Sequence, residues 1–144
     1  MKAFHVQDGM GIALALCAGV EVAFITGRTS DLVRRRAREL GVAHVQEGIR
    51  DKGAALRELA GRLGLKPEEV AFIGDDLNDL PALAWCGLPV AVAGAPRQVR
   101  AAAAWVTEAP GGRGAVRETA ERILAAQGKL EDAIASYLSG TARQ

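Results

Sequence analysis

The sequence predicts an α/β fold of the Rossmann-like type, a doubly wound parallel sheet with helices on both faces. Short apolar runs rich in β-branched residues alternate with helical segments along the chain. Strands that are separated by helices pair in parallel and are buried on both faces. The 144 residues contain no internal repeat, low-complexity tract or linker, so we expect one domain over residues 1–144.

Three helices and two strands are predicted in the first half of the chain. The first helix is apolar and ends at Gly19, while the second begins after Ser30, a good N-cap, and ends at Gly41. The third helix is amphipathic, with leucines on one stripe, and ends at Gly64. In chain order the predicted elements are a helix over 9–18, a strand over 21–26, a helix over 31–40, a strand over 42–46 and a helix over 52–63.

The second half of the chain continues this alternation. A helical turn over 66–69 leads into a buried strand over 70–73, which ends at Gly74. A last long helix is expected after Pro110-Gly111-Gly112. The remaining predicted elements are a helix over 78–86, a strand over 88–93, a helix over 97–104, a strand over 105–107, a helix over 114–126 and a tail helix over 130–138.

Charge and composition argue against several functions. Eighteen basic and 17 acidic residues give a net charge of +1, whereas a general nucleic-acid binder is usually strongly basic. The longest apolar run, over 12–20, is far shorter than the roughly 20 residues that span a bilayer, and no secretory leader precedes it. Cys17 and Cys86 form no C-x-x-C pair, so no zinc site is expected. We therefore expect a cytoplasmic protein that binds neither nucleic acid nor membrane.

An acidic cluster follows the strand predicted over 70–73. Ligands bind beyond the carboxyl ends of the strands in such sheets, and here Asp75, Asp76 and Asp79 stand at that place. Crowded carboxylates repel one another unless a cation or hydrogen bonds compensate. A hard ion such as Mg²⁺ takes one or two carboxylates, water and often substrate phosphate. The alternative is a loop whose aspartates only cap the next helix.

Two further segments suggest an anion site. Thr26 ends the strand over 21–26 and Gly27 follows it, so that a hydroxyl and backbone N–H groups are offered there. Arg28 adds a guanidinium that suits phosphate or carboxylate. The alternative is an ordinary turn capped by Ser30. Lys52 opens a helix, where the helix dipole disfavours a cation, so it is a candidate phosphate contact. Its alternative is a solvated lysine.

These three signals, in this order, resemble the haloacid dehalogenase superfamily, whose members are mostly Mg²⁺-dependent phosphatases acting through a phospho-aspartate. Further segments resemble the 3-deoxy-D-manno-octulosonate 8-phosphate phosphatases, a capless branch of that superfamily. The resemblance covers about residues 2–130. The segments that carry it are Lys2-Ala3-Phe4, Asp8-Gly9-Met10-Gly11, Ile25-Thr26-Gly27-Arg28, the string from Arg36 to Gly41, Asp51-Lys52 and the string Gly111-Gly112-Arg113-Gly114-Ala115-Val116-Arg117-Glu118.

The resemblance implies a role for each matching residue. Asp75 would bind Mg²⁺, Thr26 would hydrogen-bond the phosphoryl group, and Lys52 would neutralise it. Asp76 would lie beside the substrate and Asp79 would support the site. The implied substrate contacts are His5, Asp8, Gly9, Gly27, Arg28, Arg36, Lys52, Asp76 and Arg113. Family members are tetramers whose tail can reach a neighbour's active site, so we expect a homotetramer in which the tail over 111–144, with Arg113 and Arg117, does the same.

One expected part does not occur in the sequence. Such phosphatases carry a nucleophilic aspartate and an acid for the leaving group in a D-x-D-G-x-x-T-D-G motif on their first, central strand. Here Asp8-Gly9 is the only D-G pair, and Val6 stands two residues before Asp8. We therefore expect the first strand and its hairpin to be missing. The resemblance implies that this leaves a gap between the strands that end at Thr26 and Asp75.

Two interpretations follow from this absence. In the first, the chain is a sugar-acid phosphatase that is inactive without its D-x-D strand. In the second, it is a regulatory or assembly module that binds ligand without turnover. Gln7 and Ala13 stand where the family often has basic residues. The exact sugar acid therefore stays open, with neuraminate-type and nonulosonate phosphates as competitors. A receiver domain of the response-regulator type is disfavoured because its acids would lie on early strands.

Overall fold

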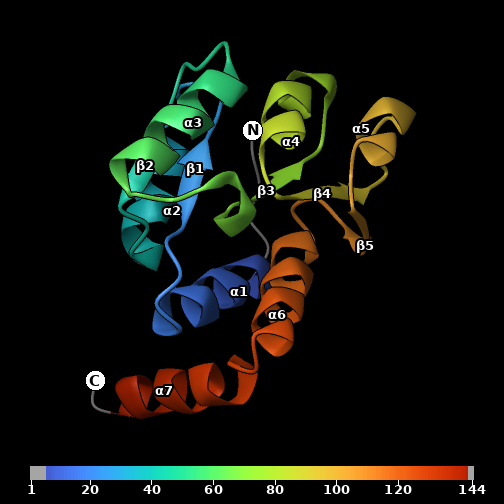
Figure 1. Cartoon of the computed structure of the whole chain (residues 1–144). Coiled ribbons are helices and arrows are strands. Elements are labelled where there is room, and N and C mark those ends of the chain that lie inside the picture. Colours follow the sequence, from blue (N-terminus) through green and yellow to red (C-terminus); the bar gives the residue numbers. More distant parts are fainter. Residues whose placement is uncertain (1–5, 143–144) are drawn as a thin grey trace.

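The computed structural model describes residues 6–142, and its side chains are described over residues 8–140. Helices surround two small parallel sheets (Figure 1). The strands are β1 (Ala23–Ile25), β2 (His44–Gln46), β3 (Ala71–Gly74), β4 (Leu88–Ala93) and β5 (Trp105–Pro110). The helices are α1 (Val6–Cys17), α2 (Asp31–Leu40), α3 (Lys52–Arg62), α4 (Leu80–Trp85), α5 (Arg97–Ala101), α6 (Ala115–Ala126) and α7 (Leu130–Ala142). Two 3₁₀ turns, η1 (Pro67–Glu69) and η2 (Leu77–Asp79), lie on either side of β3.

The sheet is divided, although the strands are parallel as predicted. β1 pairs with β2 in one sheet, and β3, β4 and β5 form the other in that order. Within the described residues β1 and β3 are not hydrogen-bonded to each other. The predicted single sheet is therefore two sheets. The division falls between β1 and β3, which lead to Thr26 and Asp75, where a gap is predicted.

Helices join the two sheets on opposite sides. On one side α3 packs against α4 and β1, and an apolar cluster there includes Leu56, Ala82 and Cys86 with Ile25 and Phe72 from the two sheets. On the other side α1 packs against α6 and α7, and all three helices lie beneath the sheets in Figure 1. The fold thus keeps the carboxyl ends of β1 and β3 facing one region without a hydrogen-bonded strand pair between them.

Local sequence explains most element boundaries. Ser30 accepts a hydrogen bond from the N–H of Val33 at the start of α2, and Gly41 ends that helix with a left-handed φ of 77°. The helix predicted over 78–86 instead divides into η2 and α4. Asp76 caps the short turn, and Pro81 is favoured in the first turn of the helix that follows. No helix within residues 6–142 is long and apolar enough to cross a bilayer.

The first prediction concerns the core beside β3. The Leu83 side chain is only 1% exposed and packs in the cluster formed by β4, α5 and the start of α6. Leu83→Ala should lower the free energy of unfolding by about 2–5 kcal/mol, because it removes buried methyl groups and leaves a cavity. Urea unfolding followed by circular dichroism measures this change. Leu77→Ala, at a side chain that is 50% exposed, is the control and should change stability by less than about 0.5 kcal/mol.

Candidate active site

Thr26 is held at the carboxyl end of β1. Its backbone N–H donates to Gln46 at 2.9 Å, and its carbonyl accepts from the N–H of Ile49 at 3.0 Å. The buried Oγ1 accepts a hydrogen bond from the N–H of Arg28 at 3.2 Å. A hydroxyl can donate one hydrogen bond while it accepts others, so Thr26 offers a fixed donor at this strand end.

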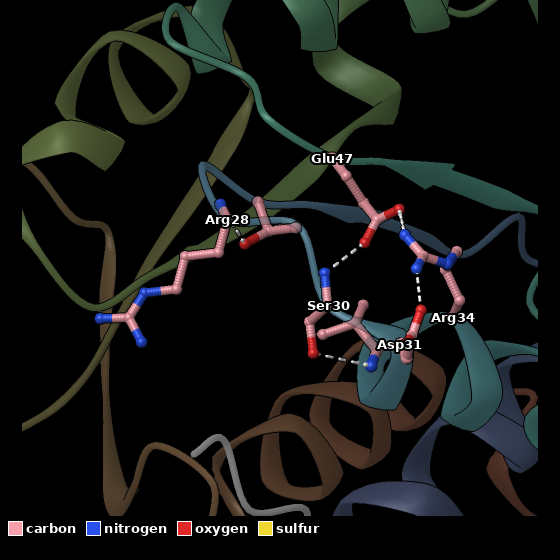
Figure 2. A network of polar contacts seen from close by, with 7 residues as sticks. Arg28, Ser30, Asp31, Arg34 and Glu47 are labelled. Carbon is pink, nitrogen blue, oxygen red and sulfur yellow. Dashed lines mark hydrogen bonds and ion pairs between the residues drawn. The ribbon is translucent and has the colours of Figure 1, made fainter.

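A polar network fixes the loop that follows Thr26 (Figure 2). Glu47, just after β2, accepts from the N–H of Ser30 at 2.8 Å and from Nη1 of Arg34 at 2.6 Å, while the other Arg34 nitrogen bonds Asp31. The hydrogen bond from the Ser30 N–H and the Arg34 guanidinium lower the pKa of Glu47. In Figure 2 the Arg28 side chain points away from this network. Glu47 thus sets the path of the loop that follows β1, a role for which the sequence contains no recognisable motif.

Lys52 and Asp79 form a buried ion pair. Nζ of Lys52 lies 2.7 Å from Oδ1 of Asp79, and the two side chains are 10% and 3% exposed. The second Asp79 oxygen accepts from the backbone N–H groups of Asp75 at 2.8 Å and Asp76 at 3.2 Å. Burial by itself would raise the pKa of Asp79, but the hydrogen bonds from Lys52 and from the Asp75 N–H outweigh it and lower that pKa. The lysine is therefore anchored and not solvated.

Backbone geometry places this pair. Asp51 caps α3 by accepting from the N–H of Ala54 at 3.0 Å, so Lys52 is the first residue of the helix. The next residue, Gly53, lies against Pro81, and an added Cβ would come within 2.9 Å of the Pro81 Cβ and 3.1 Å of its backbone. Glycine at this position lets α3 approach α4 closely, which brings Lys52 to Asp79 from the opposite sheet.

The other two aspartates of the cluster differ in their surroundings. Asp76 is exposed, and its Oδ1 accepts from the N–H of Leu77 at 2.7 Å, which makes it a cap of η2. Asp75 is exposed directly after β3 and lines the cavity described next. Within the described residues no group of three or more His, Cys, Asp or Glu side chains is arranged to hold a metal ion.

A cavity of about 540 Å³ lies between the two sheets. Its apolar walls come from both facing strands, with Phe24 and Ile25 from β1 and Phe72 and Ile73 from β3. Its polar lining includes predicted site residues from four parts of the chain: Asp8, Thr26, Lys52, and Asp75 with Asp79. Gly111 and Gly112 line the cavity as well. The structure thus brings together the hydroxyl, the ammonium and the acidic cluster that the sequence singled out.

Other predicted substrate contacts lie elsewhere. Gly9 and Arg36 line a separate pocket of about 290 Å³ with Tyr137, and Arg36 pairs with Glu39 at 3.2 Å. An added Cβ at Gly9 would lie 2.6 Å from Nη2 of Arg36. Four further predicted contacts are exposed and do not line the larger cavity: Gly27, Arg28, Asp76 and Arg113. His5 lies outside the described residues.

The tail expected to reach a neighbouring subunit packs on its own chain. α6 and α7 contact α1, and Leu14, Leu124 and Ala133 form an apolar cluster there. Arg117 of α6 pairs with Glu121 of the same helix at 3.0 Å. A role for Arg113 and Arg117 at a partner's site therefore stays a prediction.

Known proteins match this arrangement. A family model described as haloacid dehalogenase-like hydrolase matches residues 44–116. The 3-deoxy-D-manno-octulosonate 8-phosphate phosphatase KdsC of Yersinia pestis is 49% identical over 133 residues, which is 92% of this chain and 71% of that protein. The chain belongs to this phosphatase family of haloacid dehalogenase-like hydrolases. By that membership it is a phosphoric monoester hydrolase.

Solved structures of the family agree in fold. The 3-deoxy-D-manno-octulosonate 8-phosphate phosphatase of Moraxella catarrhalis, solved with magnesium, phosphate and KDO, superposes with a TM-score of 0.91 at 44% identity, covering 95% of this chain and 79% of that one. A hydrolase of the same superfamily from Legionella pneumophila superposes with a TM-score of 0.93 at 50% identity. The match covers 96% of this chain and 76% of that one. The predicted α/β fold class is thereby confirmed.

The buried ion pair predicts a pH dependence. The pKa of Asp79 is lower in the folded chain than its unfolded value of about 3.9, so the unfolded state binds the proton more readily. Its contribution to stability is full above that unfolded pKa and is lost as the pH falls through the folded one. Urea unfolding from pH 2 to 7 should show this acid slope, and Asp79→Asn should flatten it. At pH 7 the same substitution should lower the free energy of unfolding by about 3–5 kcal/mol, because Lys52 stays buried without its partner. Glu58→Gln, at an exposed surface pair, is the control.

Proposed function

We propose that the chain is a cytoplasmic Mg²⁺-dependent phosphatase of a sugar acid phosphate, most simply 3-deoxy-D-manno-octulosonate 8-phosphate. The observation that carries this proposal is the meeting of Thr26, Lys52 and Asp75 at one cavity, at the carboxyl ends of two facing strands. The substrate named in the family relatives is of this chemical class.

Each of these groups has a task on a phosphate ester. The Thr26 hydroxyl donates to a phosphoryl oxygen, and the Lys52 ammonium neutralises the dianion and the charge that spreads over its oxygens during transfer. Asp79 holds that ammonium in place, which makes it a positioning residue. The apolar walls keep water away from these contacts, so that each is stronger than in open solvent.

The described residues offer one carboxylate, Asp75, as a ligand for Mg²⁺. Asp75 is the carboxylate that would hold the ion, since both oxygens of Asp79 already accept hydrogen bonds. Mg²⁺ commonly binds through one or two carboxylates and fills its other positions with water and substrate phosphate. When bound, the ion supplies positive charge beside the transferring phosphoryl group. The Moraxella relative was solved with magnesium and phosphate, which supports this assignment.

The nucleophile has to come from a segment that these 144 residues do not include. In the proposed reaction a carboxylate oxygen attacks phosphorus, the ester P–O bond breaks, and an acid protonates the departing alcohol. Water then cleaves the aspartyl phosphate and releases inorganic phosphate. We propose that this carboxylate lies on a strand between β1 and β3. Support comes from three observations: within the described residues the facing strands β1 and β3 are not hydrogen-bonded to each other, an apolar-walled cavity lies between them, and the relatives are longer.

A binding module without turnover is the second candidate. It is favoured by one observation: the carboxylates beside Lys52 and in α1 already accept hydrogen bonds, so neither is available as a nucleophile. Asp79 bonds Lys52, and both oxygens of Asp8 accept from the backbone of α6. In either case a homotetramer is proposed, with Arg113 and Arg117 near a partner's site.

Phosphate release separates these two functions. The 144-residue chain should release no phosphate from 3-deoxy-D-manno-octulosonate 8-phosphate with Mg²⁺, because it lacks the nucleophile. A longer protein that carries a D-x-D strand before Met1 should release it, and Lys52→Met in that protein should lower kcat/KM by about 10²-fold or more. Full activity of the short chain would refute the nucleophile assignment, and an inactive long protein would favour the binding module. Neuraminate-type and other nonulosonate phosphates test the substrate class in the same assay.

Metal removal is an independent test of the Mg²⁺ assignment. EDTA should abolish phosphate release by the longer protein, and added Mg²⁺ should restore it. Asp75→Asn should raise the Mg²⁺ concentration for half-maximal activity by about tenfold or more, because one charged ligand is lost. Asp132→Asn, at an exposed residue of α7 that does not line the cavity, is the control and should leave that concentration unchanged. Activity that persists in EDTA would contradict the assignment.

A further inference from the structure

Two separate sequence motifs meet at the start of α6. Asp8 lies in the D-G-x-G segment of α1, and Gly114 and Val116 lie in the string over 111–118. Oδ1 of Asp8 accepts from the N–H of Val116 at 2.9 Å, and Oδ2 accepts from the N–H of Gly114 at 3.3 Å. The Asp8 side chain is 5% exposed, so these bonds are shielded from water. Asp8 therefore uses both of its oxygens on the backbone of α6.

This contact substitutes for a missing helix cap. The N-cap of α6 is Gly114, with a φ of 112° and no side chain that could accept from the first N–H groups. Asp8 supplies that acceptor from a distant part of the chain. Its charge is also favourable beside the positive end of the helix dipole. A glycine allows the loop to turn here, and a carboxylate from α1 makes up for what glycine lacks.

The helices must lie close for this contact to form. An added Cβ at Gly11 would lie 2.5 Å from the Cα of Arg117 and 3.0 Å from its backbone nitrogen. Glycine at residue 11 is thus required by the α1–α6 packing. The D-G-x-G segment is explained in this way as a docking surface for the first turn of α6.

A second carboxylate holds the other end of the same loop. Glu118, one turn into α6, accepts from the backbone N–H of Glu108 at 3.1 and 3.0 Å and from that of Ala109 at 3.0 Å. Glu108 and Ala109 belong to β5, which leads into the loop. Residues 111–113 are exposed between these two anchors, and Gly111 and Gly112 line the cavity beside Lys52 and Asp75.

We propose that Asp8 and Glu118 are positioning residues that together clamp the loop over residues 111–113 at the mouth of the cavity, and so set where Arg113 can meet an anionic substrate. Asp8 then acts through the loop and not by touching the substrate. The contribution of Arg113 to substrate binding rests on the proposed function, whereas the clamp itself is a property of the folded chain.

Amide hydrogen exchange on the full 144-residue chain tests the clamp. Asp8→Asn and Glu118→Gln keep the side-chain shape but replace an acceptor oxygen with an amide donor that faces an N–H. Each should speed exchange at residues 111–116 by about tenfold or more, while residues 120–126 of α6 stay protected. Glu121→Gln weakens the half-buried pair with Arg117 on the same helix and is the matched control, with no change at the loop.

Two exchange results would overturn the proposal. Unchanged exchange at residues 111–116 in Asp8→Asn would mean that Asp8 does not hold the loop. Faster exchange throughout α1 and α6 would mean that Asp8 supports the whole fold and has no particular effect on the loop.

A double-mutant cycle tests the link to Arg113. In the longer, active protein, Asp8→Asn should raise KM by about tenfold with kcat little changed, and Asp8→Asn with Arg113→Ala should be no worse than Arg113→Ala alone. Strictly additive effects would refute action through Arg113. If that protein releases no phosphate, the proposed function fails, and the exchange measurement still decides the clamp.

Discussion

The buried ion pair between Lys52 and Asp79 is the contact on which the site depends. It joins the start of α3, beside one sheet, to the turn after β3 in the other. Separating the two charges would leave at least one of them buried without a partner, which costs several kcal/mol. The pair therefore does more than hold a lysine side chain. It fixes the distance between two halves of the molecule that share no strand pairing within the described residues.

Other carboxylates fix the positions of the loops around the cavity. Glu47 ties the loop after β1 to the end of β2, and Asp76 and Asp79 shape the turn after β3. Each carboxylate bonds backbone N–H groups, so each fixes a main-chain path and not only a side chain. The walls of the cavity are apolar, while its rim is built from loops whose positions are set by acids that bond the main chain.

Much of this arrangement follows from the sequence. The spacing of apolar residues and the positions of turn residues predict the order of helices and strands. β4 and α2 match their predicted ranges. Strand-end rules predict that Thr26, Lys52 and the acidic turn meet. This reasoning fails for three predicted substrate contacts that do not line the larger cavity: Gly9, Arg36 and Asp76. Motif position does not reveal whether a side chain faces the cavity, caps its own turn or lines another pocket, because that depends on packing between distant elements.

The same limit explains the residues that sequence reasoning missed. Glu47 is a single acid after a strand, and nothing local shows that it accepts from Ser30 and Arg34. Glu118 belongs to a recognised string, but its partners lie in the preceding strand. Asp8 lines the cavity as the sequence predicts, but its hydrogen bonds to Gly114 and Val116 have no local signal. Hydrogen-bond partners that lie far apart in the sequence depend on the topology of the fold. The spacing of apolar residues does not reveal them.

The contact between Asp8 and Gly114 has a consequence for how the chain reaches its folded state. The two residues are 106 positions apart, and closing a flexible loop of that length costs roughly 4 kcal/mol of chain entropy. Contacts of such high sequence separation form slowly compared with local helices and turns. We therefore expect the rim of the cavity to be completed late in folding, after α1 and α6 have each formed. A nascent chain cannot present this rim until α6 has been synthesised.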